Sequence, residues 1–147
     1  MKRLSWLLLL LSGFLLTNVA AEQSRTFGDY TINYSAFTTD HLTPDIAKFY
    51  KIQRSKNRVM VNISIRKSTP TDKLGVPVKA QVQGTVKNLN EQLQNLDMRE
   101  IVEEGAVYYI ADTPFNNEDT LRYDFTITPE GETQPMQISF QDKFYSE

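Results

Sequence analysis

Few residues of this chain could carry out catalysis. His41 is its single histidine, and cysteine is absent. Nucleophilic triads and zinc or copper sites need at least one histidine, usually beside a cysteine or a second histidine. His41 stands in residues 38–42, a polar segment before an expected helix, where a solvated imidazole is the simpler interpretation. Without cysteine there is no thiol nucleophile, iron–sulfur ligation or disulfide exchange.

Carboxylates occur as sequence neighbours in polar turns, as in Glu103-Glu104 and Glu118-Asp119. Glycoside hydrolysis needs two acids held apart across a sugar, whereas neighbouring acids in a turn face water independently. Residues 116–119 also lack the spaced ligands and the glycine of a calcium loop. We therefore expect no catalytic residue, no metal site and no cofactor, and a hydrolase that works without histidine is the least favoured function.

Three cations lie close together in Arg54, Lys56 and Arg58, separated by Ser55 and Asn57. Such a loop could hold an acidic group of a partner. In the alternative interpretation, the cations keep a strand edge soluble while Ser55 and Asn57 satisfy backbone groups of a turn.

Residues 106–111 are apolar at odd and even positions alike, so both faces of a strand formed by them would be apolar. They include Tyr108 and Tyr109. A sandwich strand normally has one face in water, so another element must cover its second face. We expect a helix that carries Phe49 and Tyr50 to do so; otherwise one of the two tyrosines belongs to an exposed contact site for a partner. The candidate binding residues are thus Arg54, Lys56, Arg58, Tyr108 and Tyr109.

The elements that must position these residues are mostly strands. Apolar and polar residues alternate with period two in residues 30–36, 59–65, 76–86 and 121–127, followed by a shorter strand at 136–140. Hairpins are expected at 128–132 and 103–105. The alternation of apolar and polar residues changes phase between Met98 and Ile101. A bulge near Arg99 and Glu100 would explain this change.

Two further local features complete the expected elements. Gly84 indicates a bulge or a close backbone approach. Leu89, Leu93 and Leu96 also have the spacing of a short helical turn. A helix near residues 44–50 is indicated by Thr43 as its cap and Pro44 at its first position.

About seven strands and one short helix favour an all-β fold, an antiparallel β-sandwich that is immunoglobulin-like in the broad sense. A closed barrel is the alternative. Residues 22–147 are few enough for a single domain.

The first 21 residues have the layout of a secretory signal peptide. A basic start is followed by an apolar run and by Val19-Ala20-Ala21 before Glu22. We expect cleavage after Ala21 and a periplasmic, secreted domain; an uncleaved segment would be a membrane tether. No cysteine follows the run to carry a lipid anchor.

The net charge and the absence of cysteine bear on the partner and on the cellular compartment. Of the 16 basic residues, Lys2 and Arg3 lie in the leader, so 14 remain against 18 acidic ones, which argues against a nucleic-acid partner. An exported domain without cysteine fits a bacterial envelope protein.

Several stretches resemble a bacterial envelope family known as domain of unknown function 4426. They are residues 26–30 leading to Tyr34, residues 54–58 running into 59–65, residues 99–101 followed by 107–110, and residues 117–122 and 129–131. The resemblance implies a periplasmic domain behind a signal peptide and carries no catalytic residues.

We therefore expect a non-enzymatic binding module whose partner is an envelope protein or peptide, contacted through a sheet edge or a loop surface. The alternative is a carrier of a small apolar ligand between the sheets, with the short helix as its lid.

Overall fold

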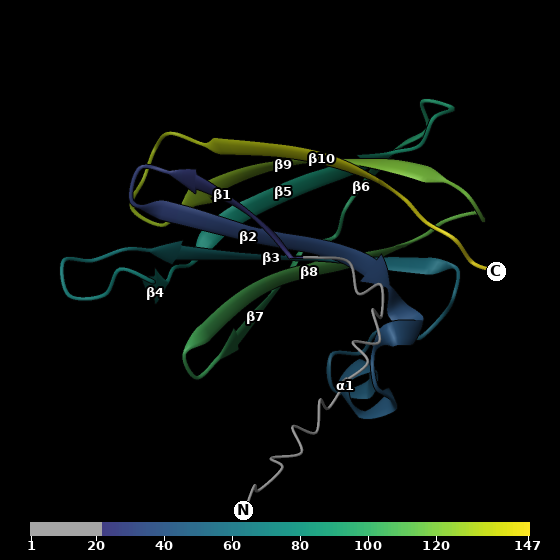
Figure 1. Cartoon of the computed structure of the whole chain (residues 1–147), viewed down its shortest axis with the longest axis horizontal. Helices are drawn as coiled ribbons and strands as arrows, with labels where there is room; N and C mark the ends of the chain where they lie inside the picture. Colours follow the sequence, from purple (N-terminus) through teal and green to yellow (C-terminus); the bar gives the residue numbers. More distant parts are fainter. Residues whose placement is uncertain (1–21) are drawn as a thin grey trace, which may run out of the picture.

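Two antiparallel sheets face each other in the computed structural model, which describes residues 22–147 (Figure 1). Sheet A has the order β1-β2-β3-β8-β7, with β4 paired to β3, and sheet B has the order β10-β9-β5-β6. The strands are β1 (Gln23–Phe27), β2 (Tyr30–Thr38), β3 (Arg58–Lys67), β4 (Val76–Pro77), β5 (Ala80–Lys87), β6 (Leu93–Asn95), β7 (Arg99–Glu103), β8 (Ala106–Pro114), β9 (Thr120–Pro129) and β10 (Met136–Lys143). The predicted antiparallel sandwich is confirmed. The predicted signal peptide lies outside the described residues.

The described part of the chain has ten strands rather than about seven. Two of the additional strands, β1 and β6, are short and have no alternating pattern to reveal them, and the third arises because one predicted strand is divided. All three residues of β6 are exposed, and β1 is exposed over four of its five residues. These strands exist because their backbones pair, β1 with β2 and β6 with β5. Residues 93–95 are therefore strand and not a helical turn.

One predicted strand, residues 76–86, is divided between the sheets. Residues 76–77 pair with β3 in sheet A, while residues 80–87 pair with β9 in sheet B. The phase slip before Ile101 has the same origin, since the chain leaves sheet B after β6 and enters sheet A at β7. A bulge at Arg99 and Glu100 was the wrong explanation, because both residues pair in unbroken register with Ile110 and Tyr109.

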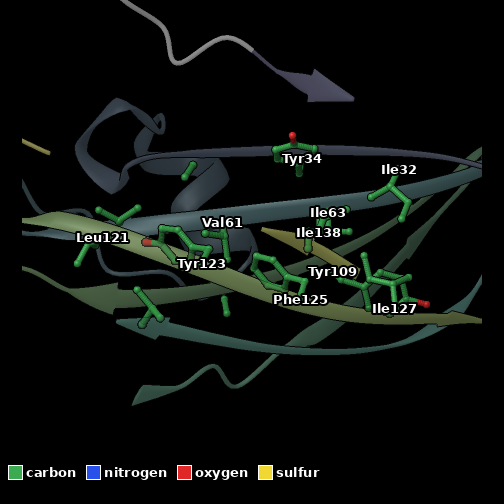
Figure 2. Close-up of a cluster of buried hydrophobic side chains, with 14 of the residues drawn as sticks. Ile32, Tyr34, Val61, Ile63, Tyr109, Leu121, Tyr123, Phe125, Ile127 and Ile138 are labelled. Atoms are coloured by element: carbon green, nitrogen blue, oxygen red, sulfur yellow. The ribbon is translucent and has the colours of Figure 1, made fainter. Parts of the chain in front are cut away.

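The core lies between the two sheets and is built from the inward residues of each alternating strand (Figure 2). Ile32, Ile63 and Ile65 from sheet A and Tyr123 and Ile127 from sheet B have no exposed surface. Burying each such side chain contributes about 1.5–3 kcal/mol, so this face of each strand fixes the register.

Aromatic rings fill much of the space between the sheets. Phe140 lies 4.8 Å from Tyr34 and 5.1 Å from Tyr123, measured between ring centroids. Phe125 lies directly over Gly84, and a Cβ atom at Gly84 would come within 2.6 Å of the ring atom Cδ1. The predicted close approach at Gly84 is confirmed.

A short helical segment covers part of the outer face of sheet A, the face turned away from sheet B (Figure 1). It consists of a 3-10 turn, η1 (Thr39–His41), and helix α1 (Pro44–Phe49). The Thr43 hydroxyl accepts from the Ile46 amide, the predicted cap. Among residues 22–147, no helix is both long and apolar enough to cross a membrane.

The helical segment packs on the outward side chains of β3 and β8. Tyr50 and Ile52 join Met60, Ile110 and Tyr108 in a second apolar cluster. The predicted cover for the second face of residues 106–111 is thus confirmed for Tyr50, whereas Phe49 stays 75% exposed. The segment does not lie over the space between the sheets, so the lid expected of a ligand carrier is not this helix.

Candidate binding surface

The outer face of sheet A is hollowed in two places that meet at Asn62 and Tyr108. One hollow, of about 230 Å³, lies under the helical segment and is lined mainly by Leu42, Ile46, Tyr50, Met60, Ile101 and Ile110. The other, of about 340 Å³, is polar and is lined by Asn33, Ser35, Ser64, Arg66 and Glu22 among others. Because both are lined by Asn62 and Tyr108, they lie side by side, and we call the two hollows together the outer-face trough.

The alternation of β2, β3 and β8 produces this trough. Every second residue of these strands faces the core, and the intervening residues face outward. The outward residues change from small polar groups, such as Asn33 and Ser64, to the apolar Met60 and Ile110 near the helix. The trough therefore has one apolar end and one polar end.

Asn62 lies at the junction of the two ends and carries an unpartnered acceptor. Its Oδ1 atom is buried and has no hydrogen-bond partner among the described residues. Leaving a buried acceptor unpaired costs about 1–3 kcal/mol. Such a group calls for an explanation, and a bound donor is one.

The wall of the apolar end is held by Tyr50. Its hydroxyl donates to the Glu103 carboxylate, which joins the end of α1 to β7. That hydrogen bond is the main reason the pKa of Tyr50 is raised to about 12. The phenol therefore stays protonated at neutral pH and keeps its donor role.

The two candidate tyrosines have different positions. Tyr108 is half-buried and lines both ends of the trough. Tyr109 is only 4% exposed; its hydroxyl accepts from the Ala80 amide of sheet B at 2.8 Å and donates to Glu100 at 2.9 Å. Burial is the main cause that raises the pKa of Tyr109 to about 12. Of the two, only Tyr108 can meet a partner.

The candidate cations bond largely to their own chain. Arg54 donates to the carbonyl oxygens of Leu42 at 2.7 Å and Asp40 at 3.1 Å, and Arg58 pairs with Asp112 at 2.7 Å. Lys56 is exposed. Contact of this cluster with an acidic partner stays a prediction, and the structure gives both arginines a role in the fold.

His41 belongs to a local turn. Its Nδ1 atom lies 2.7 Å from the Thr38 hydroxyl and 3.3 Å from Asp40, and more than half of its side chain is exposed. In residues 22–147, no three histidine or acidic side chains gather into a group that could hold a metal ion.

Sequence reasoning missed Asn62 and Met60, although a signal existed. Met60 is an apolar residue at the outward phase of an otherwise alternating strand, as is Ile110 on β8. Only the register that pairs Asn62 with Ile110 shows that these positions share one surface.

Comparison with known proteins identifies relatives of the whole domain. A family described as "Domain of unknown function (DUF4426)" matches residues 24–147. The crystal structure of a DUF4426 family protein from Pseudomonas aeruginosa aligns with a TM-score of 0.71 at 29% identity, covering 84% of this chain and 94% of that one.

Two more distant structures share the fold. FetP of uropathogenic Escherichia coli aligns with a TM-score of 0.59 at 12% identity, covering 86% of this chain and 95% of FetP. A copper-bound variant of FetP aligns with a TM-score of 0.57 at 12% identity, covering 85% of this chain and 95% of the variant. No functionally curated protein matches. The match over nearly the whole described domain establishes that this chain belongs to the DUF4426 family.

Proposed function

We propose that this chain is a non-enzymatic domain of the bacterial periplasm that holds an extended peptide segment of an envelope protein in the outer-face trough. The observation that carries the proposal is the buried, unpartnered Oδ1 atom of Asn62 at the junction of the apolar and polar ends. A peptide is a ligand that brings a backbone N–H donor and an apolar side chain together.

The dimensions and chemistry of the trough suit an extended chain. Side chains on one face of a strand recur about every 6.6 Å, which allows one apolar side chain under the helix and polar neighbours beyond Asn62. A peptide N–H that donates to Asn62 recovers the free energy lost by its burial. Tyr108, shared by both ends, would contact the peptide along its length.

Charge favours a neutral or basic peptide. The mature domain has 18 acidic and 14 basic residues, and Glu22 and Glu103 line opposite ends of the trough. Like charges placed together in an interface oppose binding, so an acidic segment would be disfavoured.

The periplasmic location rests on the signal-peptide layout of residues 1–21. The non-enzymatic role rests on the side chains of the trough. Most of these are amides, hydroxyls and apolar groups. Of the charged groups, the Glu103 carboxylate is bonded to Tyr50, Arg66 donates to the carbonyl oxygens of Leu74 and Gly75, and Glu22 lies at the polar end. The copper of the FetP variant is not carried over, because 12% identity indicates only a shared fold.

The test is selection of short random peptides displayed on phage against the protein purified from the periplasm after expression of the full chain. Synthetic copies of selected peptides are then titrated into ¹⁵N-labelled protein. We expect saturable shifts of the amides of Asn62, Ile101 and Tyr108. The substitution Asn62→Leu should weaken binding at least about fivefold, the loss of one hydrogen bond.

Gln137→Leu is the matched control, since Gln137 is an exposed amide on β10 of the other sheet. It should leave the affinity unchanged. The proposal is overturned if selected peptides shift residues outside the trough, if both substitutions have the same effect, or if no peptide binds.

A further inference from the structure

A separate pocket opens between the two sheets, at the end of the sandwich where β8 finishes. Its volume is about 420 Å³, and its walls include Val86 of β5, Leu93 of β6, Thr113 of β8, and Phe115 and Leu121. Thr113 faces inward, away from the outer-face trough, so this inter-sheet pocket is a different site.

Two hydroxyl groups at the base of this region are buried without partners. Thr113 is 3% exposed and Tyr123 is fully buried, yet neither Oγ1 of Thr113 nor the phenol oxygen of Tyr123 has a hydrogen-bond partner among the described residues. Burial raises the pKa of Tyr123, so its phenol stays protonated. The Thr113 hydroxyl lies close enough to lower that pKa as a hydrogen-bonding neighbour would, although the two groups do not meet the geometry of a formed hydrogen bond.

An unpaired hydroxyl at a buried position reduces stability, and valine would fill the same space as threonine without that cost. Thr113 lines the pocket directly. A hydroxyl can donate one hydrogen bond and accept two. The hydroxyl is buried beside the pocket, so a molecule that enters from the open end bonds with it once the side chains over it shift.

The walls next to Thr113 are apolar. Val86 and Leu121 are each 5% exposed and Phe115 is 7% exposed, and Phe115 packs against Phe144 at 5.8 Å between centroids. Leu93 lines the pocket as well but is 63% exposed. Apolar walls with a few placed polar groups are the usual composition of a small-molecule site, and the volume lies in the usual range.

The rim is polar but carries little free charge. The Asn88 amide donates to Gln92 at 2.6 Å, and Asp119 accepts from the Asn116 backbone amide at 2.8 Å. Among the described residues, no lysine or arginine lines the pocket. An anionic ligand would therefore have no counter-charge there, and the one carboxylate is already bonded.

We infer that the inter-sheet pocket binds a small uncharged molecule with an apolar ring or chain and one hydroxyl group, which forms a hydrogen bond with Thr113. The apolar part packs against Val86, Phe115 and Leu121. This site is independent of peptide binding in the outer-face trough, and either can exist without the other.

Phenol and toluene are the probes, because they have nearly the same shape and differ by a hydroxyl in place of a methyl group. Each is titrated into ¹⁵N-labelled protein from the periplasm. We expect phenol to give saturable shifts of the amides of Thr113, Phe115 and Leu121, with toluene binding at least about fivefold more weakly.

The substitution Thr113→Val removes the hydroxyl and keeps the shape. It should weaken the binding of phenol at least about fivefold, and the affinity for toluene should stay unchanged or increase. Thr126→Val on the outer side of β9 is the control and should alter neither affinity. Because Thr113→Val removes an unpaired buried group, it is expected to fold.

Three outcomes overturn the inference. Equal affinities for phenol and toluene would show that no hydroxyl is recognised. Shifts that lie outside the pocket would place the probe elsewhere. An absence of saturable shifts up to millimolar concentrations would mean that the pocket holds only water.

Discussion

Replacing Gly84 by alanine tests whether the closest contact between β5 and the aromatic core is a limit on packing. Gly84 is paired with Phe125 across β5 and β9, and the ring of Phe125 lies over it. A Cβ atom at position 84 would stand 2.6 Å from Cδ1 of that ring and 3.0 Å from a methyl group of Leu96. Real Cβ atoms do not come within 3.0 Å of another carbon, so the ring must move.

The ring has little room to move. Phe125 is 2% exposed. Its ring centroid lies 6.0 Å from that of Phe140 and 6.2 Å from that of Tyr123, and the rings are nearly parallel. Overpacking of a core costs about 1–3 kcal/mol. Alanine also restricts the unfolded chain, which stabilises the folded state by about 0.4–1 kcal/mol. The balance predicts that Gly84→Ala lowers the free energy of unfolding by about 1–2 kcal/mol.

Urea unfolding followed by circular dichroism measures this change. With a slope of about 2 kcal/mol per molar urea, the midpoint should fall by about 0.5–1 M. The same substitution in a Phe125→Leu background should cost much less, because the clashing ring carbons are gone, and the coupling between the two sites should be about 1 kcal/mol. An unchanged midpoint, or an equal cost in both backgrounds, would refute the packing argument.

Three further predictions follow from the same structure. Thr113→Val should raise the free energy of unfolding by about 1 kcal/mol, seen as a higher urea midpoint, because an unpaired buried hydroxyl is removed. Since the pKa values of Tyr50 and Tyr109 are raised to about 12, the folded state holds more protons than the unfolded state above pH about 10. Stability should therefore fall as pH rises from about 10 to 12, with a smaller slope for Tyr109→Phe in urea midpoints measured at stepped pH. Intact-mass spectrometry of periplasmic protein should give a chain that begins at Glu22, and a chain that begins at Met1 would contradict the proposed cleavage.

The central strands could be predicted because burial of one face imposes a pattern on the sequence. Residues 30–36, 59–65 and 121–127 alternate and lie within β2, β3 and β9. The short strands could not be predicted. Strands β1 and β6 are exposed and are held by backbone pairing, which depends on the neighbouring strand and leaves little trace in side-chain type.

The candidate surface was predictable only in part. Tyr108 drew attention because residues 106–111 are apolar at both phases, and it does line the outer-face trough. Asn62 has no distinguishing neighbour in sequence. Its importance depends on the pairing of β3 with β8, which brings it to the junction of two hollows, and on the burial of its Oδ1 atom.

Tyr109 helps to hold the register of β8, which decides which of its residues face the trough and which face the pocket. Along β8, Tyr108 and Ile110 point outward, whereas Tyr109 and Thr113 point into the core. A slip of one residue in register would exchange the two sets, moving Tyr108 inward and Thr113 outward. The hydroxyl of Tyr109 opposes such a slip, because it bonds at once to the Ala80 amide of sheet B and to Glu100 on β7. The buried position of Tyr109 therefore leaves Tyr108 on the outer face, and in the proposed peptide site the part of Tyr109 is to position Tyr108.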